Sequence, residues 1–581
     1  MPWTRPHATA ALSLLALCAG AHAPPAYASD AAATRDGPHA VAHRTTDPPR
    51  IDGKLDDPAW QSVPSHGDFV ERQPRLRSSP PVDTRFTVLF DHEALYFAVR
   101  AQDDQPENIR AQTRTRDDFA MFGDDVISIK IDPTLDRRTT IGFAINAGGA
   151  KLDYRGIDEQ DFRIEFDAVW QGAARRTKNG WTAELRIPFA ALGIQPAKRP
   201  AIIGLNLTRD HARRNGSYDW ALMAPPFSPI AASRYGTMSG LDAKLDGRLG
   251  DEANDSVASH VALVPYAIGG FRREAGESVR SRAKNEAVLS GGVDALAQLG
   301  SYATHLTINT DFSQVDLDNQ IVNFSRFGLF VPEKRDFFLR DLEALSFGKP
   351  GHSQLLYSRR IGLYDGNTVP IMAGAKTVGR PHDKVRVGVL QVTTRPTDVL
   401  PWTSHAAARS TVELGGGSNT GVMLTHRGSL ENSRDHNVAF GVDGTWRGAA
   451  VPLLIRTAAF GSVTGADAAA PDAATGGAGN GAFANRVAPG GGVEVSLRDE
   501  LFHPRASYAY LHPELRTDLG FLQRVGVHQT AANLDIQPTV GAYGIRRVII
   551  SQGISGVVSA EDDQLLDWQG SGNLKIVWDA G

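Results

Sequence analysis

Short stretches in which apolar residues alternate with polar or small ones recur along most of the chain. From about residue 51 onward they are separated by turn residues and repeat at the spacing typical of a β-sandwich. The predicted strands of this front part are residues 85–91, 95–101, 126–132, 141–146, 181–187 and 202–209. Pro188 ends one of these strands, as expected of a residue that cannot donate a hydrogen bond to a sheet.

The pattern of apolar and polar residues changes after residues 241–259, a polar stretch that we predict to be a linker. In segments 293–299, 438–442 and 493–498, aliphatic residues alternate with small or charged ones. This pattern suits strands with one face in lipid and the other lining a wet lumen. Strands of a soluble β domain alternate in the same way, so the pattern alone leaves both alternatives open. Residues 461–492 are rich in Gly and Ala and are predicted to form a loop.

Length and composition agree with a folded protein of several domains. The 581 residues are 41% hydrophobic and 22% charged, with a net charge of −4, and the mean hydropathy is −0.25. After the first thirty residues, no apolar run is long enough to cross a bilayer as a helix. The absence of a basic domain argues against nucleic acid as a partner.

The amino terminus has the layout of a secretory signal peptide. Arg5 precedes the apolar stretch 8–19, and small-residue cleavage patterns follow at residues 21–23 and 26–28. The only cysteine, Cys18, lies within this segment, so the mature chain would contain no disulfide. The predicted organisation is a signal peptide (1–28), a flexible mature N-terminus (29–44), a β-sandwich (45–240), the linker (241–259) and a barrel domain (260–581).

Four segments of the front part resemble, in this order, the family 9 carbohydrate-binding-like domain. They are residues 51–60 (IDGKLDDPAW), 94–99 (ALYFAV), 123–133 (GDDVISIKIDP) and 180–189 (GWTAELRIPF). The resemblance covers about residues 45–240 and implies a β-sandwich that binds oligosaccharide or polysaccharide.

The back part is similar to the uncharacterised C-terminal domain that follows such modules in bacterial outer-membrane proteins. The residues that carry this are 309–316 (NTDFSQVD), 323–327 (NFSRF), 330–339 (FVPEKRDFFL), 356–362 (LYSRRIG) and 374–376 (GAK). The resemblance implies a membrane β-barrel in contact with outer-membrane lipid and a sandwich in the periplasm. Arg340 stands where an acidic residue is expected. The final residues, 579–581, lack the terminal aromatic usual in such barrels, which favours a truncated barrel.

Sugar binding needs flat aromatic faces and planar polar side chains in a concave site. Trp60 and Trp181 belong to the motif frame and are expected in the core. The predicted ligand-binding residues are Trp170, Trp220, Phe122, Glu71 and Arg116. In the family that the sandwich resembles, a tryptophan near the Asp-Asp strand helps to hold the sugar, and Phe122 stands nearest to that place.

Calcium needs several hard oxygen ligands at one site. Aspartates at turns supply carboxylates, and the resemblance implies a structural calcium for which Asp124 and Asp125 are the candidate ligands. The alternative is that these aspartates shape turns and strand ends.

An enzymatic alternative is the hydrolysis of O-glycosyl bonds, which requires two carboxylates at a set separation. Asp316 and Glu333 are the candidate catalytic residues, from an acidic set that lies close to several basic residues. The same charges would equally form salt bridges in a barrel interior. Three functions therefore stay open: non-catalytic sugar recognition or uptake, glycoside hydrolysis, and a structural role in which the sandwich docks a partner.

Overall fold

The computed structural model of this chain describes most residues from 37 to 578. The described ranges are 37–157, 159, 161–164, 166–194, 200–241, 260–274, 284–299, 302–309, 328, 330–331, 333–349, 353–364, 367–382, 384–398, 400–448, 451–467 and 485–578. The predicted signal peptide and nearly all of the predicted linker lie outside these residues.

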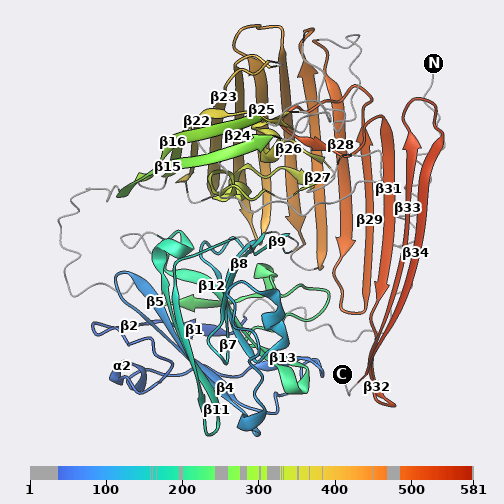
Figure 1. Ribbon diagram of the computed structural model, residues 1–581. Helices are drawn as coiled ribbons and strands as arrows, with labels where there is room; N and C mark the ends of the chain where they lie inside the picture. The colour runs from blue at the N-terminus through green and yellow to red at the C-terminus, as the bar shows by residue number, and fades with distance from the viewer. Residues whose placement is uncertain are drawn as a thin grey trace.

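Two sheets form the front part. In the first, the path runs β1 (His39–Val41), β14 (Gly236–Ser239), β12 (Ile202–His211), β6 (Val126–Asp132), β7 (Thr139–Asn146), β8 (Lys151–Ile157) and β9 (Asp161–Arg163), with β13 (Gly216–Asp219) joining β12 to β3 (Val70–Gln73). In the second, the order is β10 (Gln171–Thr177), β11 (Gly180–Pro188), β5 (Ala94–Gln102), β4 (Thr84–Phe90) and β2 (His43–Arg44). Figure 1 shows these blue and green strands as one unit beneath the yellow-to-red strands.

One apolar core joins the two sheets. Phe97 and Leu185 of the second sheet and Ile129 and Phe143 of the first are fully buried in it. Trp181 is 1% exposed, so the prediction that it fills the core is confirmed. All six strands predicted for this part are present. Burial of apolar area on this scale is the main stabilising contribution to such a sandwich.

The sandwich begins earlier than predicted. Residues 39–44 were expected to be flexible, but β1 pairs in parallel with β14, and β2 pairs in parallel with β4. Ala40 and Ala42 are buried. Strands of two or three residues are too short to show an alternating pattern in the sequence. Both strands form because they pair with strands far along the chain.

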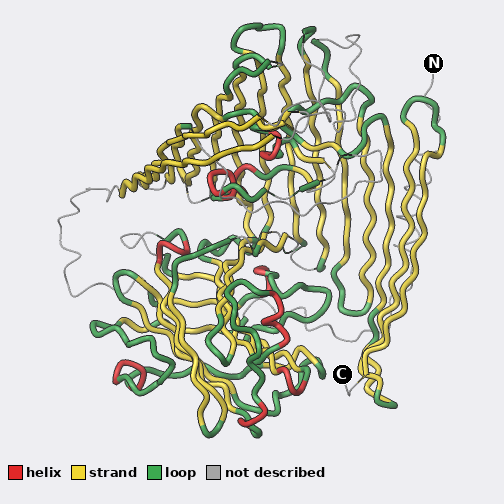
Figure 2. Tube along the Cα trace, in the orientation of Figure 1, coloured by secondary structure: helices red, strands yellow, loops and turns green. Residues whose placement is uncertain are grey.

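The back part is one large antiparallel sheet, called here the barrel sheet. Its strands, in spatial order, are β15 (His260–Glu274), β16 (Lys284–Leu299), β17 (Tyr302–Ile308), β22 (Ile371–His382), β23 (Val385–Thr394), β24 (Thr403–Gly415), β25 (Ser418–Ser429), β26 (His436–Arg447), β27 (Leu453–Thr464), β28 (Ala488–Leu497), β29 (Phe502–Leu511), β31 (Val527–Ile536), β33 (Ile545–Ser559) and β32 (Thr539–Ala542), with β34 (Leu565–Trp578) also on β33. Figure 2 shows these long strands running side by side. Within the described residues, no pairing joins β15 to β34 and the sheet is not closed.

The barrel sheet has an apolar outer face. Val422 pairs across from Val442, and Leu424 pairs across from Phe440. All four side chains are 40–53% exposed. Directly opposite residues of an antiparallel pair point to the same side, so these form a continuous apolar surface. The alternation predicted from the sequence is therefore confirmed, with its apolar residues outward.

The inner face carries polar and packed side chains. Arg409 donates to both oxygens of Asp443 at 2.8 Å, and Arg456 pairs with Glu494 at 3.0 Å. Between β17 and β22, the chain forms the short helices α3 (Asp336–Leu339), η7 (Leu342–Leu345) and η8 (Ser358–Arg360). Their buried residues, including Phe338 and Leu345, join a core with inward-facing residues of the barrel sheet.

The Gly/Ala-rich loop is shorter than predicted. Residues 461–464 belong to β27 and residues 488–492 belong to β28, with Gly461 opposite Pro489. A side chain at Gly490 would come within 2.8 Å of the Phe460 ring. Close packing in the sheet therefore requires a glycine at this position. The Gly-rich composition of the segment led to the wrong prediction of a loop here. Residues 468–484 lie outside the described residues. In the part of the chain that the structure describes, no helix is long and apolar enough to cross a membrane.

Candidate carbohydrate face, ionic cluster and domain junction

A group of aromatic rings with one exposed member lies where the loop before β6 meets β9. The 3-10 helix η3 (Phe119–Gly123) begins after Asp118, whose side chain accepts the backbone N–H of Ala120. Phe119 is 58% exposed. Its ring centroid lies 5.3 Å from that of Phe122 and 5.6 Å from that of Phe162. We call Phe119, Phe122 and Phe162 the aromatic patch; it offers an apolar face of the kind that stacks on a sugar ring.

Polar groups stand close to this patch along the chain. Arg116 donates to Asp153 at 2.8 Å and to Asp117 at 3.1 Å, and its contact with Asp167 is 2.5 Å. Asp167 is the exposed member, with 76% of its side chain accessible. Burial raises the pKa of Asp153, while hydrogen bonds from Trp170 and Ala168 oppose that shift. Arg116, a predicted ligand-binding residue, is therefore held by Asp117, Asp153 and Asp167.

Trp170 is not an open ring face. It is 4% exposed, its indole N–H donates to Asp153 at 3.0 Å, and its ring packs on Phe143 with the centroids 5.4 Å apart. The prediction that the Trp170 ring is open to a ligand is therefore wrong. The ring instead packs inside the sandwich, on Phe143 and beside Asp153. The reason is that Trp170 leads directly into β10, where the two sheets meet.

Trp220 and Glu71, which were also predicted to bind ligand, are buried inside the sandwich. Trp220 is 4% exposed and meets Phe86 edge to face at 5.3 Å. Glu71 is 1% exposed and accepts the backbone N–H of Arg75 at 2.9 Å. In the described residues, neither has a hydrogen bond or ring contact with the aromatic patch. Trp220 directly follows β13, which pairs with both β12 and β3. The pairing of β13 with the distant β3, and with it the burial of Trp220, could not be predicted from the sequence.

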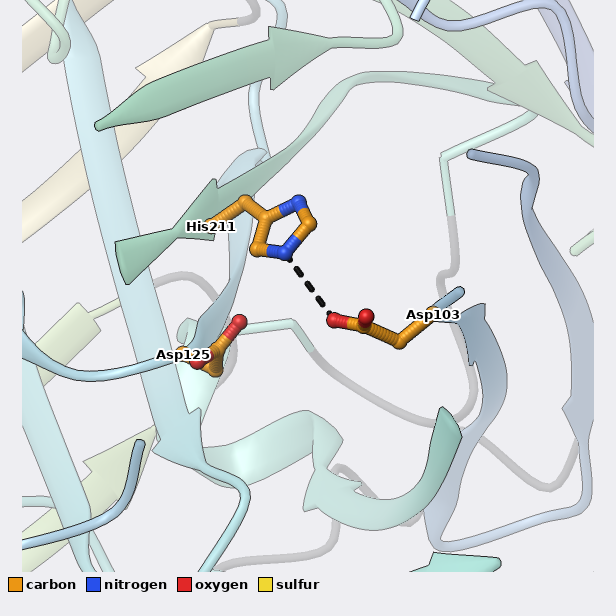
Figure 3. A group of neighbouring side chains, drawn as sticks. All are labelled: Asp103, Asp125 and His211. Atoms are coloured by element: carbon orange, nitrogen blue, oxygen red, sulfur yellow. Dashed lines mark ion pairs between the residues drawn. The ribbon is translucent and has the colours of Figure 1, made fainter. Parts of the chain in front are cut away.

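A buried ionic cluster joins the two sheets of the sandwich. His211 Nε2 lies 2.9 Å from Asp103 Oδ2, and Asp125 completes a group whose ligand atoms lie within 4.8 Å of one another (Figure 3). Arg209 donates to Thr84 Oγ1 at 3.0 Å and to the Gln102 carbonyl at 2.6 Å. Burial, followed by the positive charge of Arg209, lowers the pKa of His211 to about 4.

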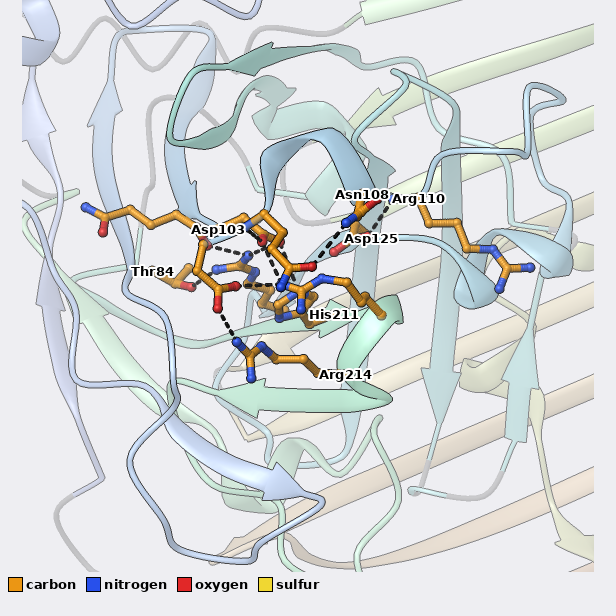
Figure 4. A network of polar contacts seen from close by, with 12 residues as sticks. Thr84, Asp103, Asn108, Arg110, Asp125, His211 and Arg214 are labelled. Atoms are coloured by element: carbon orange, nitrogen blue, oxygen red, sulfur yellow. Dashed lines mark hydrogen bonds and ion pairs between the residues drawn. The ribbon is translucent and has the colours of Figure 1, made fainter. Parts of the chain in front are cut away.

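Arginines occupy the surroundings of this cluster (Figure 4). Arg209 Nη2 lies 4.0 Å from Asp103, and Arg213 donates to Asp103 at 2.9 Å. Calcium binds six to eight oxygen ligands, whereas this group offers two carboxylates and an imidazole beside guanidinium groups. The residues present do not suit calcium. The acidic group of Asp117, Asp153 and Asp167 is likewise already bridged by Arg116.

Asp124 and Asp125 do not act as a pair. Asp124 accepts the backbone N–H groups of Gln112 and Thr113, each at 2.9 Å, and the Asn146 amide at 3.0 Å. Asp125 instead accepts the N–H of Arg110 at 2.8 Å and faces the ionic cluster. The two carboxylates hold the loop ahead of β6, which is the turn-shaping alternative.

Glu333 lies in an internal salt bridge. Its carboxylate accepts from Arg335 Nε at 2.8 Å, from Arg335 Nη2 at 2.7 Å and from Ser358 Oγ at 2.6 Å. Arg335 also donates to the carbonyls of Ile361 and Ser358. The hydrogen bonds from Arg335 and Ser358 lower the pKa of Glu333 against the effect of burial. Both carboxylate oxygens are thus taken up by hydrogen bonds within the protein. Asp316 lies outside the described residues.

The sandwich and the barrel sheet meet through ion pairs. Glu159, 2% exposed at its side chain, contacts Arg447 at 3.0 Å and also Arg498. Asp136 pairs with Arg386 at 3.5 Å, and Arg155 pairs with Glu343 at 2.6 Å. Sequence reasoning missed these residues because ion pairs between distant segments leave no local pattern.

The comparisons with known proteins divide the chain at the same place. Residues 51–238 match the model of the carbohydrate family 9 binding domain-like family, and residues 260–400 match the domain of unknown function DUF5916. No curated protein matches the chain.

Solved structures are similar to one part of the chain or to most of it. A carbohydrate binding module family 9 from Caldicellulosiruptor kristjanssonii in complex with cellotriose covers 36% of this chain and 97% of its own, at 16% identity and a TM-score of 0.27. OccK8 (OprE) of Pseudomonas aeruginosa covers 78% of this chain and 88% of its own, at 11% identity and a TM-score of 0.30. OccAB3 of Acinetobacter baumannii covers 78% and 86%, at 7% identity and a TM-score of 0.25.

Proposed function

Because this chain carries a family 9 carbohydrate-binding-like domain followed by a DUF5916 region, we propose that it is an outer-membrane protein whose periplasmic sandwich recognises carbohydrate without cleaving it. The observation that carries the proposal is the aromatic patch. Among the strongly exposed large apolar side chains of the described sandwich, Phe119 is the aromatic one, and its ring contacts those of Phe122 and Phe162. Arg116, which precedes Phe119 in the chain, pairs with the exposed Asp167.

The membrane location rests on the outer face of the barrel sheet. Apolar side chains such as Val422, Val442 and Leu424 are about half exposed there, while Arg409 and Asp443 pair on the inner face. This division matches a sheet with lipid outside and water inside. Exposure of so large an apolar surface to water would favour aggregation.

The orientation rests on turn lengths. Arg386, Arg447 and Arg498, which contact the sandwich, lie beside the tight connections β22–β23, β26–β27 and β28–β29. The opposite end of the sheet carries longer connections, residues 465–487 and 512–526. Outer-membrane barrels have short periplasmic turns and long external loops. The sandwich at the short-turn end is therefore assigned to the periplasm.

Glycoside hydrolysis is less well supported, since both oxygens of Glu333 are bound by Arg335 and Ser358. We therefore assign binding, and not bond cleavage, as the step at the sandwich.

The test uses the full chain in detergent, on a glycan array and by calorimetry with the glycans that bind. Phe119→Ala removes the exposed ring, and we expect at least tenfold weaker binding, since one sugar-stacking ring contributes about 1.5 kcal/mol. Ile202→Ala, at an apolar side chain that is 45% exposed at the far end of the same sandwich, is the matched control. Equal binding by both variants and the wild type would place the sugar elsewhere, and no binding by any would remove the proposed function.

A further inference from the structure

A polar cavity lies where the sandwich meets the barrel sheet. It has a volume of about 490 Å³, and Glu159, Pro226 and Ser228 of the sandwich form one side. The other side consists of residues from β28, β29, β31, β33 and β34 and the turn after β28. Sites for small organic ligands have volumes of roughly 300–1,000 Å³, so this cavity can hold a mono- or disaccharide.

The barrel side of the cavity is a row of inward-facing polar side chains. Asn533 stands opposite Gly553, which stands opposite Ser571, and Asp535 stands opposite Ser551. Ser496 stands opposite Arg505 in the same way. Opposite residues share a face of the sheet, so hydroxyl, amide and charged groups from five strands point into one space.

Two of the lining groups lack a hydrogen-bond partner in the part of the chain that the structure describes. They are Ser496 Oγ and His503 Nε2, on residues that are 5% and 8% exposed. His503 Nδ1 lies 3.4 Å from Gln537 Nε2; if that amide donates to Nδ1, Nε2 carries the proton and can donate to a ligand. A buried polar group without a partner is unfavourable, and a ligand hydroxyl at this place would supply the missing hydrogen bond.

The charges of the cavity lining indicate the class of ligand. Two lining residues are positively charged, Arg498 and Arg505, and two are negatively charged, Glu159 and Asp535. Arg498 is already paired with Glu159. A balanced lining gives no net attraction for an anion or a cation, and amides and hydroxyls instead match a neutral, hydroxyl-rich solute.

We propose that this junction cavity is a saccharide site, separate from the aromatic patch, that takes a neutral mono- or disaccharide between the sandwich and the barrel lumen. It lacks a Phe, Tyr or Trp ring among its described lining residues, so binding is weak, as suits a solute in transit. Glu159, Pro226 and Ser228 of the sandwich form one of its sides, so the site is complete only while the sandwich is docked. The proposal rests on the proposed function for its barrel lumen.

The test measures saccharide binding to the full chain in detergent by saturation-transfer NMR and calorimetry, with glucose, maltose and cellobiose as probes. Asn533→Leu and Ser496→Ala each remove hydrogen-bonding groups from the cavity. The cavity forms a second, weaker class of saccharide sites, and we expect each variant to lower the affinity of this class about fivefold, since one net hydrogen bond contributes about 1 kcal/mol. Phe119→Ala should leave this class intact. Heat-modifiable gel mobility shows that each variant is folded.

The outcomes separate the two proposals. Loss of the weak class in both cavity variants, with its retention in Phe119→Ala, supports the junction site. Loss of all saccharide binding in Phe119→Ala, with no change in the cavity variants, overturns the junction site and leaves the proposed function standing. Cavity-dependent binding of glucuronate or inorganic phosphate in preference to the neutral sugars overturns the assigned ligand class.

Discussion

Folding of the sandwich changes the acid–base behaviour of His211 at the residue scale. Its pKa falls from 6.5 to about 4 because burial and Arg209 disfavour the imidazolium. Between these values the unfolded chain binds a proton that the native chain does not, so stability falls as the pH drops below 6.5. From pH 6.5 to 5, we expect this residue to lower the free energy of unfolding by about 1–2 kcal/mol.

Chemical denaturation of the full chain at a series of pH values checks this prediction, followed by tryptophan fluorescence of the sandwich. His211→Gln should be less stable at neutral pH but should show a flatter response between pH 6.5 and 5. His92→Gln, at a residue whose side chain is 71% exposed, is the control. An unchanged pH response in His211→Gln would contradict the assignment.

Residue identity predicted only part of the candidate site. Phe122, proposed because it stands near the Asp-Asp strand, lies in the aromatic patch. Arg116 precedes the patch in the chain, and a ligand contact of either residue stays a prediction. Trp170 was predicted to offer its ring to a ligand, but it is 4% exposed. Phe119 was missed because a loop phenylalanine carries no sign of whether its ring faces water. Exposure is decided by tertiary packing, which one sequence without a structure does not specify.

Strands were predictable at the element scale because alternation is a local property. The barrel sheet shows this at β26 and β28, where alternating residues do face opposite sides. The limits appear where an element depends on a distant partner, as in β1 with β14. They appear also where composition misleads, as at Gly490 beside Phe460.

A charge on the outer face of a barrel strand tests the lipid contact of that element. Val442→Arg on β26 should destabilise the folded barrel by about 2–4 kcal/mol if the position lies near the bilayer midplane. Gln529→Arg on the inner face of β31 is the control, since it faces the lumen. Refolding into lipid vesicles, read by heat-modifiable mobility, measures both. Similar folding yields for the two variants would show that this face does not meet hydrocarbon.

At the scale of the whole molecule, one buried carboxylate holds two parts of the chain together. Glu159 contacts Arg447 and Arg498 across the junction with almost no solvent exposure. Removing one partner of a buried ion pair costs about 3–5 kcal/mol because the remaining charges stay buried. Glu159→Gln should therefore weaken docking of the sandwich without unfolding either part.

Hydrogen exchange of the full chain in detergent measures the docking. In Glu159→Gln, we expect faster exchange at the backbone around Ser228 and around the turn that holds Arg498, with unchanged protection in the cores of β6 and β26. Glu93→Gln is the matched control, since Glu93 pairs with Arg186 at 2.7 Å on the exposed sandwich surface. If both variants exchange like the wild type at the junction, the ion pairs there do not hold the sandwich in place.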